Sequence, residues 1–241
     1  MRTIVFSDVH GEPDIIEAVL AHASFDAGAD RLIFAGDAIE VGRDSSRCLD
    51  LLEQLGAECL VGNHEYGVFT GRPVEDEPLD PELVRRVVDS IESGRWRIAV
   101  AADGILITHA GVGKRFAVDA ESGDAGGGAD LIARVLNHEF EVAVASRSRK
   151  AGSVVGSSGP LWWRPGSNGV PIPGVTQIAG HTPAEILDGA DAAAHWAARG
   201  VFLIDPYVRG WRARDFLPPV PIRYAVIEDG AVQVVVEGEH A

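Results

Sequence analysis

The sequence predicts an α/β fold with a mostly parallel sheet covered by helices and a second sheet formed late in the chain. Three observations lead to this prediction. Short apolar runs alternate with stretches of helical periodicity in the first part of the chain, each run ends in glycine and polar residues, and the last part becomes rich in β-branched residues. With 241 residues, of which 46% are hydrophobic, the chain can bury a substantial core. We therefore expect a single domain over residues 1–241.

The first elements alternate between strand and helix. The run from Thr3 to Phe6 is β-branched and aromatic and is followed by polar residues, which predicts a strand. Apolar residues at helical spacing after Pro13 predict a helix. The same unit then repeats as RLIFAGD, SSRCLDLLEQLG and AECLVGNHE, which predict a strand, a helix and a strand that ends at Asn63. The segment GILITHAG predicts a fourth strand, ending at His109.

The remaining elements are interpreted as insertions and a strand-rich end. Residues 78–93 and 129–146 have helical periodicity, and we interpret the surrounding segments, about 66–98 and 119–160, as helical insertions between sheet elements. The runs VFLID, IRYAVIED and AVQVVVE are separated by turns such as Glu228-Asp229-Gly230. This pattern favours strands, and we expect them to form the second sheet.

The charge balance restricts the classes of partner. The formal net charge is −15, from 21 Lys and Arg against 36 Asp and Glu, so the average surface field repels anionic polymers and membranes. Long nucleic acids and membranes are therefore not expected as partners. The start of the chain lacks a signal-peptide pattern and no window has the apolar length of a membrane span, so we expect a cytoplasmic location. The cysteines Cys48 and Cys59 are expected to be reduced core thiols.

Polar residues follow each of the predicted strands whose ends meet at the carboxyl edge of the sheet. They are Asp8-Val9-His10, Gly36-Asp37, Gly62-Asn63-His64-Glu65, His109-Ala110-Gly111 and Gly180-His181-Thr182-Pro183. One such residue alone is usually structural, but their repetition at successive strand ends indicates a site. Carboxylate, amide and imidazole ligands together suit Mn²⁺, Fe or Zn²⁺ better than Ca²⁺. Two such cations, about 3.5–4 Å apart, can hold a phosphate for hydrolysis.

The order of these motifs, DxH, GD, GNHE, H and GH, resembles the calcineurin-like metallophosphoesterase superfamily over residues 3 to about 206. The motifs GNHE, HAG, GHTP and LWWRP are similar to the branch that contains bacterial phosphoprotein phosphatases and symmetrical diadenosine tetraphosphate hydrolases. The resemblance implies a four-layer α/β/β/α sandwich of two mixed sheets flanked by helices. It also implies a dinuclear metal site at the strand carboxyl ends, with two divalent ions, Mn²⁺ as the first choice and Fe or Zn²⁺ as alternatives.

The resemblance also assigns roles to the residues of these motifs. It implies a first metal bound by Asp8, His10 and bridging Asp37, and a second bound by Asp37, Asn63, His109 and His181. It implies that His64 protonates the leaving oxygen of the substrate. We expect Asn63 to face the ion and His64 the substrate because neighbouring residues of an extended chain point to opposite sides.

The sequence departs from the family pattern after Asp37. Family members read GDxVDRG or GDxVARG, whereas this chain reads GDAIEVG, with Val41 at the position of a phosphate-binding arginine. Glu40 is the candidate to orient His64 in place of an aspartate. Arg164, and with less support Arg43, are the candidates to bind a phosphate oxygen.

Three further residues are singled out besides the motifs. Trp162 and Trp163 suit either the wall of a substrate pocket or a packed core. Asp205 ends a predicted strand and is expected to have a structural role.

The function that follows from the resemblance is hydrolysis of a phosphomonoester or phosphoanhydride by in-line attack of a metal-bridging hydroxide. The first candidate is a serine/threonine-type protein phosphatase-like enzyme with a phosphorylated protein as substrate, and the alternative is a nucleotide or dinucleoside polyphosphate hydrolase. A non-catalytic binding scaffold of the same fold is the alternative from another class. Such scaffolds typically lose the histidine that this chain retains as His64.

Overall fold

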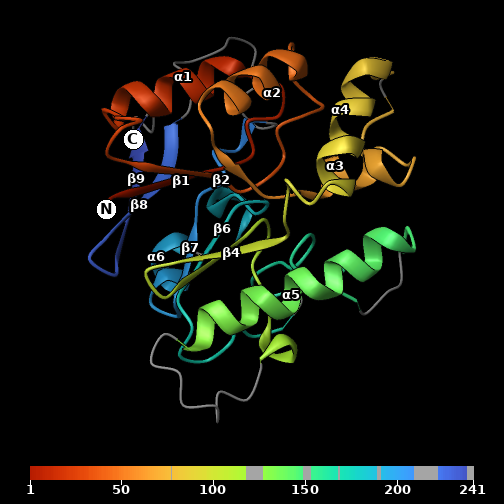
Figure 1. The fold of residues 1–241 in the computed structure, drawn as a ribbon. Helices are drawn as coiled ribbons and strands as arrows, with labels where there is room; N and C mark the ends of the chain where they lie inside the picture. The colour runs from red at the N-terminus through yellow and green to blue at the C-terminus, as the bar shows by residue number, and fades with distance from the viewer. Residues whose placement is uncertain are drawn as a thin grey trace.

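The structure of the protein is a computed structural model, shown as a ribbon in Figure 1. It describes the following parts of the chain: residues 1–76, 78–117, 127–148, 153–167, 169–188, 191–208 and 222–237. The helices and strands in these parts form an α/β fold with two mixed sheets and helices on their outer sides, which confirms the predicted fold class.

The first sheet has the strand order β3-β2-β1-β8-β9. Its strands are β1 (Thr3–Phe6), β2 (Arg31–Phe34), β3 (Glu58–Cys59), β8 (Ile222–Glu228) and β9 (Ala231–Glu237). Strands β1, β2 and β3 are parallel, whereas β8 runs antiparallel to β1. A tight turn joins β8 to β9, and Asp229 and Gly230 there both have positive φ, as expected for a two-residue hairpin loop.

The second sheet has the strand order β4-β5-β6-β7. Its strands are β4 (Ala99–Ala102), β5 (Ile105–Thr108), β6 (Gln177–Ala179) and β7 (Val201–Leu203). Apolar side chains of both sheets meet in one buried cluster that includes Val5 and Ile33 from the first sheet and Ile107 and Ile178 from the second. The two sheets therefore pack face to face, and this contact holds the carboxyl ends of β1, β2, β5 and β6 near one another.

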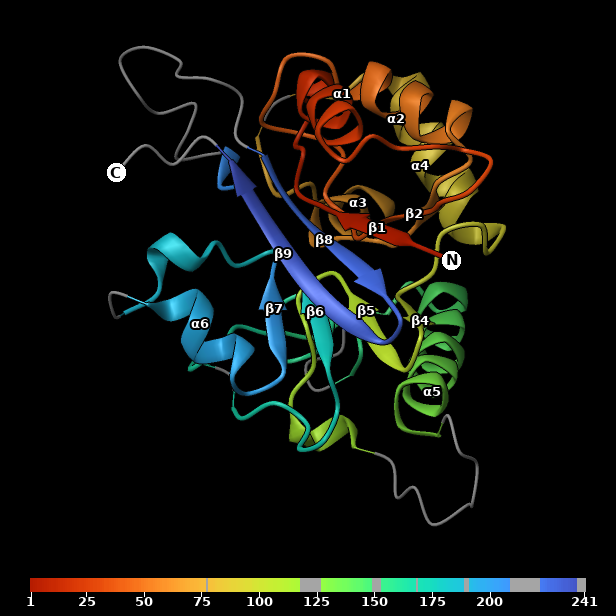
Figure 2. The ribbon, with the colours of Figure 1, turned by 90° about the vertical axis from the view of Figure 1, so that its left-hand side faces the viewer.

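Helices cover the outer faces of the two sheets (Figure 2). Helices α1 (Pro13–His22), α2 (Ser45–Gln54), α3 (Asn63–Phe69) and α4 (Pro81–Glu92) lie on the side of the first sheet. Helices α5 (Gly127–Ala145) and α6 (Ala192–Ala197) lie on the side of the second sheet, with the short 3-10 turns η1 (Lys114–Phe116) and η2 (Ala184–Ile186). The predicted helices at 78–93 and 129–146 are thus present as α4 and α5.

The assignment of strands to sheets differs from the prediction. The late strands do not form the second sheet by themselves, because β8 and β9 extend the first sheet, while the predicted fourth strand is β5 of the second sheet. Strand β4, which pairs with β5, was not predicted from the sequence. All these strands have similar apolar patterns, so their partners are decided by long-range packing that local periodicity does not report.

The third strand is shorter than predicted. Strand β3 ends at Cys59, and Asn63 begins helix α3 instead of ending a strand. The carboxylate of Glu65 accepts a hydrogen bond from the N–H of Gly62 at 2.9 Å, which is half of a capping box and favours helix initiation here.

Other expectations concern the whole chain. Both Cys48 and Cys59 are buried and free, as predicted. Within the described residues, no helix is long and apolar enough to cross a membrane. The organisation as a single domain with insertions at 66–98 and 119–160 stays a prediction, and residues 118–126 and 149–152 of the second insertion lie outside the described residues.

Candidate metal centre

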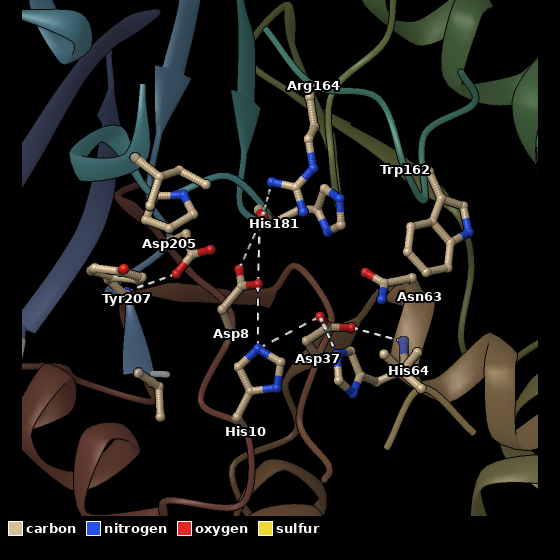
Figure 3. A pocket seen from close by; sticks show the side chains of 14 residues that line it. Asp8, His10, Asp37, Asn63, His64, Trp162, Arg164, His181, Asp205 and Tyr207 are labelled. Carbon is tan, nitrogen blue, oxygen red and sulfur yellow. Dashed lines mark hydrogen bonds and ion pairs between the residues drawn. The ribbon is translucent and has the colours of Figure 1, made fainter. Parts of the chain in front are cut away.

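The polar residues singled out in the sequence converge on one pocket at the carboxyl ends of the strands (Figure 3). The pocket has a volume of about 300 Å³. The predicted ligands that line it are Asp8, His10, Asp37, Asn63 and His181, and His64 and Arg164 line it as well. His109 lies against Asp37 and is fully buried. The first three motifs follow strands of the first sheet and the last two follow strands of the second, so the pocket lies where the two sheets meet.

The carboxylate of Asp37 is at the centre of the cluster. Its Oδ2 atom lies 3.7 Å from Nε2 of His10, 3.7 Å from Nε2 of His64 and 3.4 Å from Nε2 of His109. Asp37 belongs to two groups of side chains whose ligand atoms all lie within 4.8 Å of one another: Asp37 with His10 and His64, and Asp37 with His109 and His181. A carboxylate shared by two such groups has the position of a bridging ligand, while the ligand roles themselves stay predictions.

The histidines of the second group fit a cation. Burial lowers the pKa of His109 to about 3, so its imidazole is neutral at neutral pH. Its Nδ1 lies 2.9 Å from the carbonyl oxygen of Ala35 and donates to it, which leaves Nε2 without a hydrogen. This Nε2 faces Oδ1 of Asn63 at 2.9 Å, so two acceptors point at each other, as they do around a metal ion. Nε2 of His181 is buried without a hydrogen-bond partner among the described residues.

The two carboxylates also fit a cation. Burial raises the pKa of Asp8 and of Asp37, and the nearby carboxyl groups of Asp205 and Glu65, respectively, raise them further. The backbone N–H of His181 donates to Asp8 at 3.0 Å, which partly offsets the cost of burying its charge. A divalent cation between these groups would remove the remaining repulsion.

Glycines allow the backbone to approach the carboxylates closely. A Cβ atom on Gly62 would lie 2.0 Å from Oδ1 of Asp37, and a Cβ atom on Gly180 would lie 2.0 Å from Oδ2 of Asp8. Any larger residue at these positions would displace a candidate ligand. This explains why glycine precedes Asn63 and His181 in the sequence.

His64 is held by Glu40. Nδ1 of His64 donates to Oε2 of Glu40 at 2.7 Å, and Glu40 also accepts the backbone N–H groups of Glu75 at 3.0 Å and Val74 at 3.4 Å. Both side chains of the pair are buried. The arrangement fixes the ring so that Nε2 points towards Asp37 and the pocket, which is the geometry of a proton donor held by a carboxylate.

The prediction that Asn63 and His64 point in different directions because they lie in an extended chain is wrong about the cause. The two residues are in the first turn of α3, not in an extended chain. Successive side chains of a helix are rotated by about 100°, because the helix has about 3.6 residues per turn. The Asn63 amide therefore points to His109, while the His64 ring lies 4.6 Å from the ring of His10, measured between centroids.

The two candidate arginines have different surroundings. Nη1 of Arg164 lies 3.4 Å from the carbonyl oxygen of His181 and from Oγ1 of Thr182, and the side chain lines the pocket. Arg43 is 55% exposed in its side chain, pairs with Asp14 and Glu12, and is not among the residues that line the pocket. The geometry therefore does not support a phosphate contact by Arg43.

Sequence reasoning assigned no role to Glu65, although the structure gives it one. This fully buried carboxylate accepts three backbone N–H groups, from Asp37, Ala38 and Gly62, at 2.7–2.9 Å. These hydrogen bonds connect the loop after β2 to the start of α3. A glutamate three residues after a helix N-cap is a recognisable signal for such a role.

The structure also places the two tryptophans, for which the sequence allows either a pocket or a core position, and Asp205, for which it predicts a structural role. Trp162 lines the pocket, whereas Trp163 is fully buried in the core. Asp205 has the expected structural contact, because it accepts the N–H of Tyr207 at 2.7 Å, but it also lines the pocket. Burial raises the pKa of Asp205 to about 7. Its place after β7 follows the same strand-end rule as the other pocket residues and was a usable signal.

Comparisons with known proteins agree with this geometry. A family model described as calcineurin-like phosphoesterase matches residues 1–185. The chain is 37% identical over 124 residues to the symmetrical bis(5'-nucleosyl)-tetraphosphatase of Photorhabdus laumondii, a segment that covers 46% of this chain and 45% of that protein. The chain thus spans less than half the length of this curated relative.

Solved structures show the same fold. A cold-active protein tyrosine phosphatase of Shewanella sp. superposes with a TM-score of 0.63 at 15% identity, over 97% of this chain and 80% of the other. A putative diadenosine tetraphosphatase superposes with a TM-score of 0.54 at 17% identity, over 99% and 95% of the two chains. The family model covers most of the chain, and it includes every predicted metal ligand from Asp8 to His181. This protein belongs to the calcineurin-like phosphoesterase family.

Proposed function

We propose that this protein is a metal-dependent hydrolase that cleaves phosphoanhydride bonds in nucleotides. The observation that carries the proposal is the His64–Glu40 pair, in which Nδ1 of His64 lies 2.7 Å from Glu40 while Nε2 lies 3.7 Å from the shared carboxylate of Asp37. A buried imidazole fixed in this way has no structural need to face a cluster of candidate metal ligands. It suits a general acid that gives its proton to the leaving oxygen.

Two divalent ions in the cluster would supply positive charge for the phosphate oxygens and lower the pKa of a water molecule. The residues proposed to hold them are Asp8, His10, Asp37, Asn63, His109 and His181. We propose Mn²⁺ as the first choice, with Fe or Zn²⁺ as alternatives, because the set combines imidazole nitrogens with carboxylate and amide oxygens.

Arg164 supports the binding of the substrate phosphate. Its guanidinium group lies at the wall of the pocket next to His181, and a planar guanidinium can donate two hydrogen bonds to one phosphate. Trp162 forms another part of the wall, and an indole ring can stack on a nucleobase. The pocket thus offers a binding group for each half of a nucleotide.

We propose a nucleotide substrate in preference to a phosphoprotein because of the name of a similar protein. The sequence alone favoured a protein phosphatase-like enzyme, but the relative at 37% identity is named as a symmetrical bis(5'-nucleosyl)-tetraphosphatase. The protein phosphatases among the solved structures share only 13–17% identity and support the fold alone. A dinucleoside polyphosphate is therefore the proposed substrate class.

A substrate screen tests the proposal. Purified protein loaded with Mn²⁺ is incubated with diadenosine tetraphosphate, p-nitrophenyl phosphate and a phosphoserine peptide, and released products are measured by chromatography. We expect turnover of diadenosine tetraphosphate with a kcat/KM above that for the phosphopeptide. A higher kcat/KM for the phosphopeptide would support the protein phosphatase alternative. No turnover of any substrate, with less than one metal ion per chain, would support a binding scaffold.

The role of His64 has its own test. In His64→Ala we expect turnover of diadenosine tetraphosphate to fall about 10²–10⁴-fold, the usual contribution of a general acid. The metal content, measured by mass spectrometry, should stay at the wild-type value. Loss of metal together with activity would instead make His64 a metal ligand.

A further inference from the structure

A second cavity adjoins the metal pocket, and Trp162 lines both. This cavity, which we call the Trp162 cleft, has a volume of about 490 Å³ and is lined by residues that include Tyr66, Thr70, Arg72 and Ser157. Three residues line both the cleft and the metal pocket: Asn63, Val74 and Trp162. The cleft is therefore a continuation of the candidate active site, and its volume is in the range of small-molecule sites, about 300–1,000 Å³.

Arg72 supplies a positive charge to this cleft. It is exposed, and its side chain forms no hydrogen bond or ion pair within the described residues. Other exposed or half-buried arginines are paired, for example Arg43 with Asp14, and Arg86 with Asp50 and Glu53. An exposed guanidinium with no acidic partner at the mouth of a cavity is free to bind an anion.

The backbone around Arg72 is held in place. Its N–H donates to the carbonyl oxygen of Gly67 at 2.8 Å, and a Cβ atom on Gly67 would lie 2.8 Å from the carbonyl oxygen of Arg72. The turn after α3 is thus packed too closely for any residue but glycine at position 67. This close contact fixes where the Arg72 side chain starts, so its position at the cleft follows from the fold.

The segment that carries Arg72 also supports the proposed acid. The N–H groups of Val74 and Glu75 bind the carboxylate of Glu40, which holds His64. The wall of the cleft and the orientation of the acid thus depend on one short stretch of chain. In Figure 3, Trp162 and Asn63 lie on one side of the pocket, and Asp205 and Tyr207 lie on the opposite side.

We propose that the Trp162 cleft binds the leaving group of the substrate, a nucleoside polyphosphate, with Arg72 on a phosphate beyond the cleaved bond and Trp162 beside the base. This inference rests on the proposed function. In the reaction, a water molecule releases a proton to solvent and its oxygen bonds to phosphorus, while the bond from phosphorus to the leaving oxygen breaks. The leaving phosphate takes the proton of His64, which regains a proton from solvent. The leaving group must extend away from His64, which lines the metal pocket, and it carries further negative charge. The cleft shares Asn63, Val74 and Trp162 with that pocket and carries Arg72, so it can receive such a group.

A comparison of two substrates tests the cleft. Diadenosine tetraphosphate has phosphates and a base beyond the cleaved bond, whereas the leaving group of p-nitrophenyl phosphate has neither. In Arg72→Ala, the ratio of kcat/KM for diadenosine tetraphosphate to kcat/KM for p-nitrophenyl phosphate should fall about 10- to 100-fold, the effect of losing one charge-assisted hydrogen bond. Arg72→Lys should recover part of the ratio because it keeps the charge.

Arg134→Ala is the matched control. Arg134 is an exposed arginine on α5, outside both cavities, and its replacement makes the same change in net charge. This variant should keep the wild-type ratio. A second readout is the inhibition constant of adenosine diphosphate, which should rise about 10-fold or more in Arg72→Ala and stay unchanged in Arg134→Ala.

The outcomes separate the cleft from the proposed function. If wild-type protein hydrolyses both substrates but Arg72→Ala keeps the wild-type ratio and inhibition constant, the cleft inference is wrong and the proposed function stands. The same conclusion follows if Arg134→Ala changes the ratio as much as Arg72→Ala. If wild-type protein hydrolyses neither substrate, the proposed function itself fails.

Discussion

At Glu40 and Val41 the backbone adopts positive φ values of 66° and 69°, in the left-handed region. Few residues with a Cβ atom adopt this conformation, and a β-branched valine is an outlier there. Such strain is found at functional sites, where the surrounding structure enforces it. Here the turn brings the carboxylate of Glu40 to Nδ1 of His64. The long side chain of Glu40 therefore reaches the histidine from a strained backbone position.

The first prediction concerns this pair. Glu40→Gln should lower kcat for diadenosine tetraphosphate by about 10²-fold or more, because an amide oriented by its NH₂ group would hold His64 in the wrong tautomer. The measurement is steady-state kinetics together with metal analysis, and metal content should not change. As a control, Glu53→Gln alters an exposed glutamate on α2 and should keep the wild-type kcat. A variant at position 40 with wild-type kcat would show that Glu40 does not orient the acid.

The second prediction concerns Asp205, whose pKa burial raises to about 7. A carboxyl group with a raised folded-state pKa binds its proton more tightly in the folded protein than in the unfolded chain. Its contribution to stability is therefore complete below about pH 4, near its unfolded pKa, and is lost as the pH rises towards 7. In chelator-treated protein, the free energy of unfolding of Asp205→Asn minus that of the wild type should therefore increase as the pH rises from 4 to 7.

Urea unfolding of both proteins at several pH values between 4 and 8 measures this difference. A difference that stays constant over the whole range would mean that Asp205 titrates in the folded protein as it does in the unfolded chain.

Among the elements, α3 determines the geometry of the site most directly. It is only seven residues long, and both Asn63 and His64 are in its first turn. Helices of this length are not stable by themselves, so tertiary contacts must hold the start of α3 in place. Glu65 supplies such contacts because its carboxylate accepts hydrogen bonds from three backbone N–H groups, two of which belong to the loop after β2. The bridging candidate Asp37 and the candidate acid His64 are thereby held in fixed positions relative to each other.

The third prediction follows from this contact. Glu65→Gln should lower the free energy of unfolding by about 2–4 kcal/mol, because the glutamine NH₂ group would face backbone N–H groups that are then left without an acceptor. Urea denaturation measures the effect, and Glu139→Gln, at an exposed position of α5, is the control. Affinity for Mn²⁺ should fall as well, since Asp37 and Asn63 would no longer be held together. Wild-type stability of the variant would contradict the role assigned to Glu65.

The elements also show what the sequence can predict. The strands β1, β2, β5 and β6 were recognisable from short apolar runs that end in glycine and polar residues, and so were the site residues that follow them. The start of α3 was missed because AECLV suggests a strand that continues, while the signal for the helix is a single glutamate. The partners of β8 and β9 were misassigned because register with β1, more than 200 residues earlier, depends on packing.

For the whole molecule, the most important feature is that the candidate ligands come from both sheets. Asp8 and Asp37 follow strands of the first sheet, whereas His109 and His181 follow strands of the second. An ion bound by Asp37 together with His109 and His181 would join the two sheets as well as serve the chemistry. Without it, the protein buries carboxylates at close range, which costs free energy.

The fourth prediction is that metal removal destabilises the protein. Chelator treatment at pH 7.5 should lower the midpoint of thermal unfolding, and added Mn²⁺ should restore it in a concentration-dependent way. Circular dichroism measures the transition. The shift should be smaller in His181→Ala, which removes one of the candidate ligands contributed by the second sheet. A midpoint that does not respond to chelator would mean that no bound ion links the sheets.

The position of β1 between β2 and β8 has a consequence for how the chain is made. During synthesis, Asp8 and Asp37 emerge early, but His181 emerges much later, and β8, the antiparallel neighbour of β1, emerges later still. Contacts so distant along the chain form slowly, because a long loop must close first. A growing chain therefore has only part of the candidate metal centre for most of its synthesis. If these residues bind the ions as proposed, tight metal binding becomes possible only when translation of these late strands is complete.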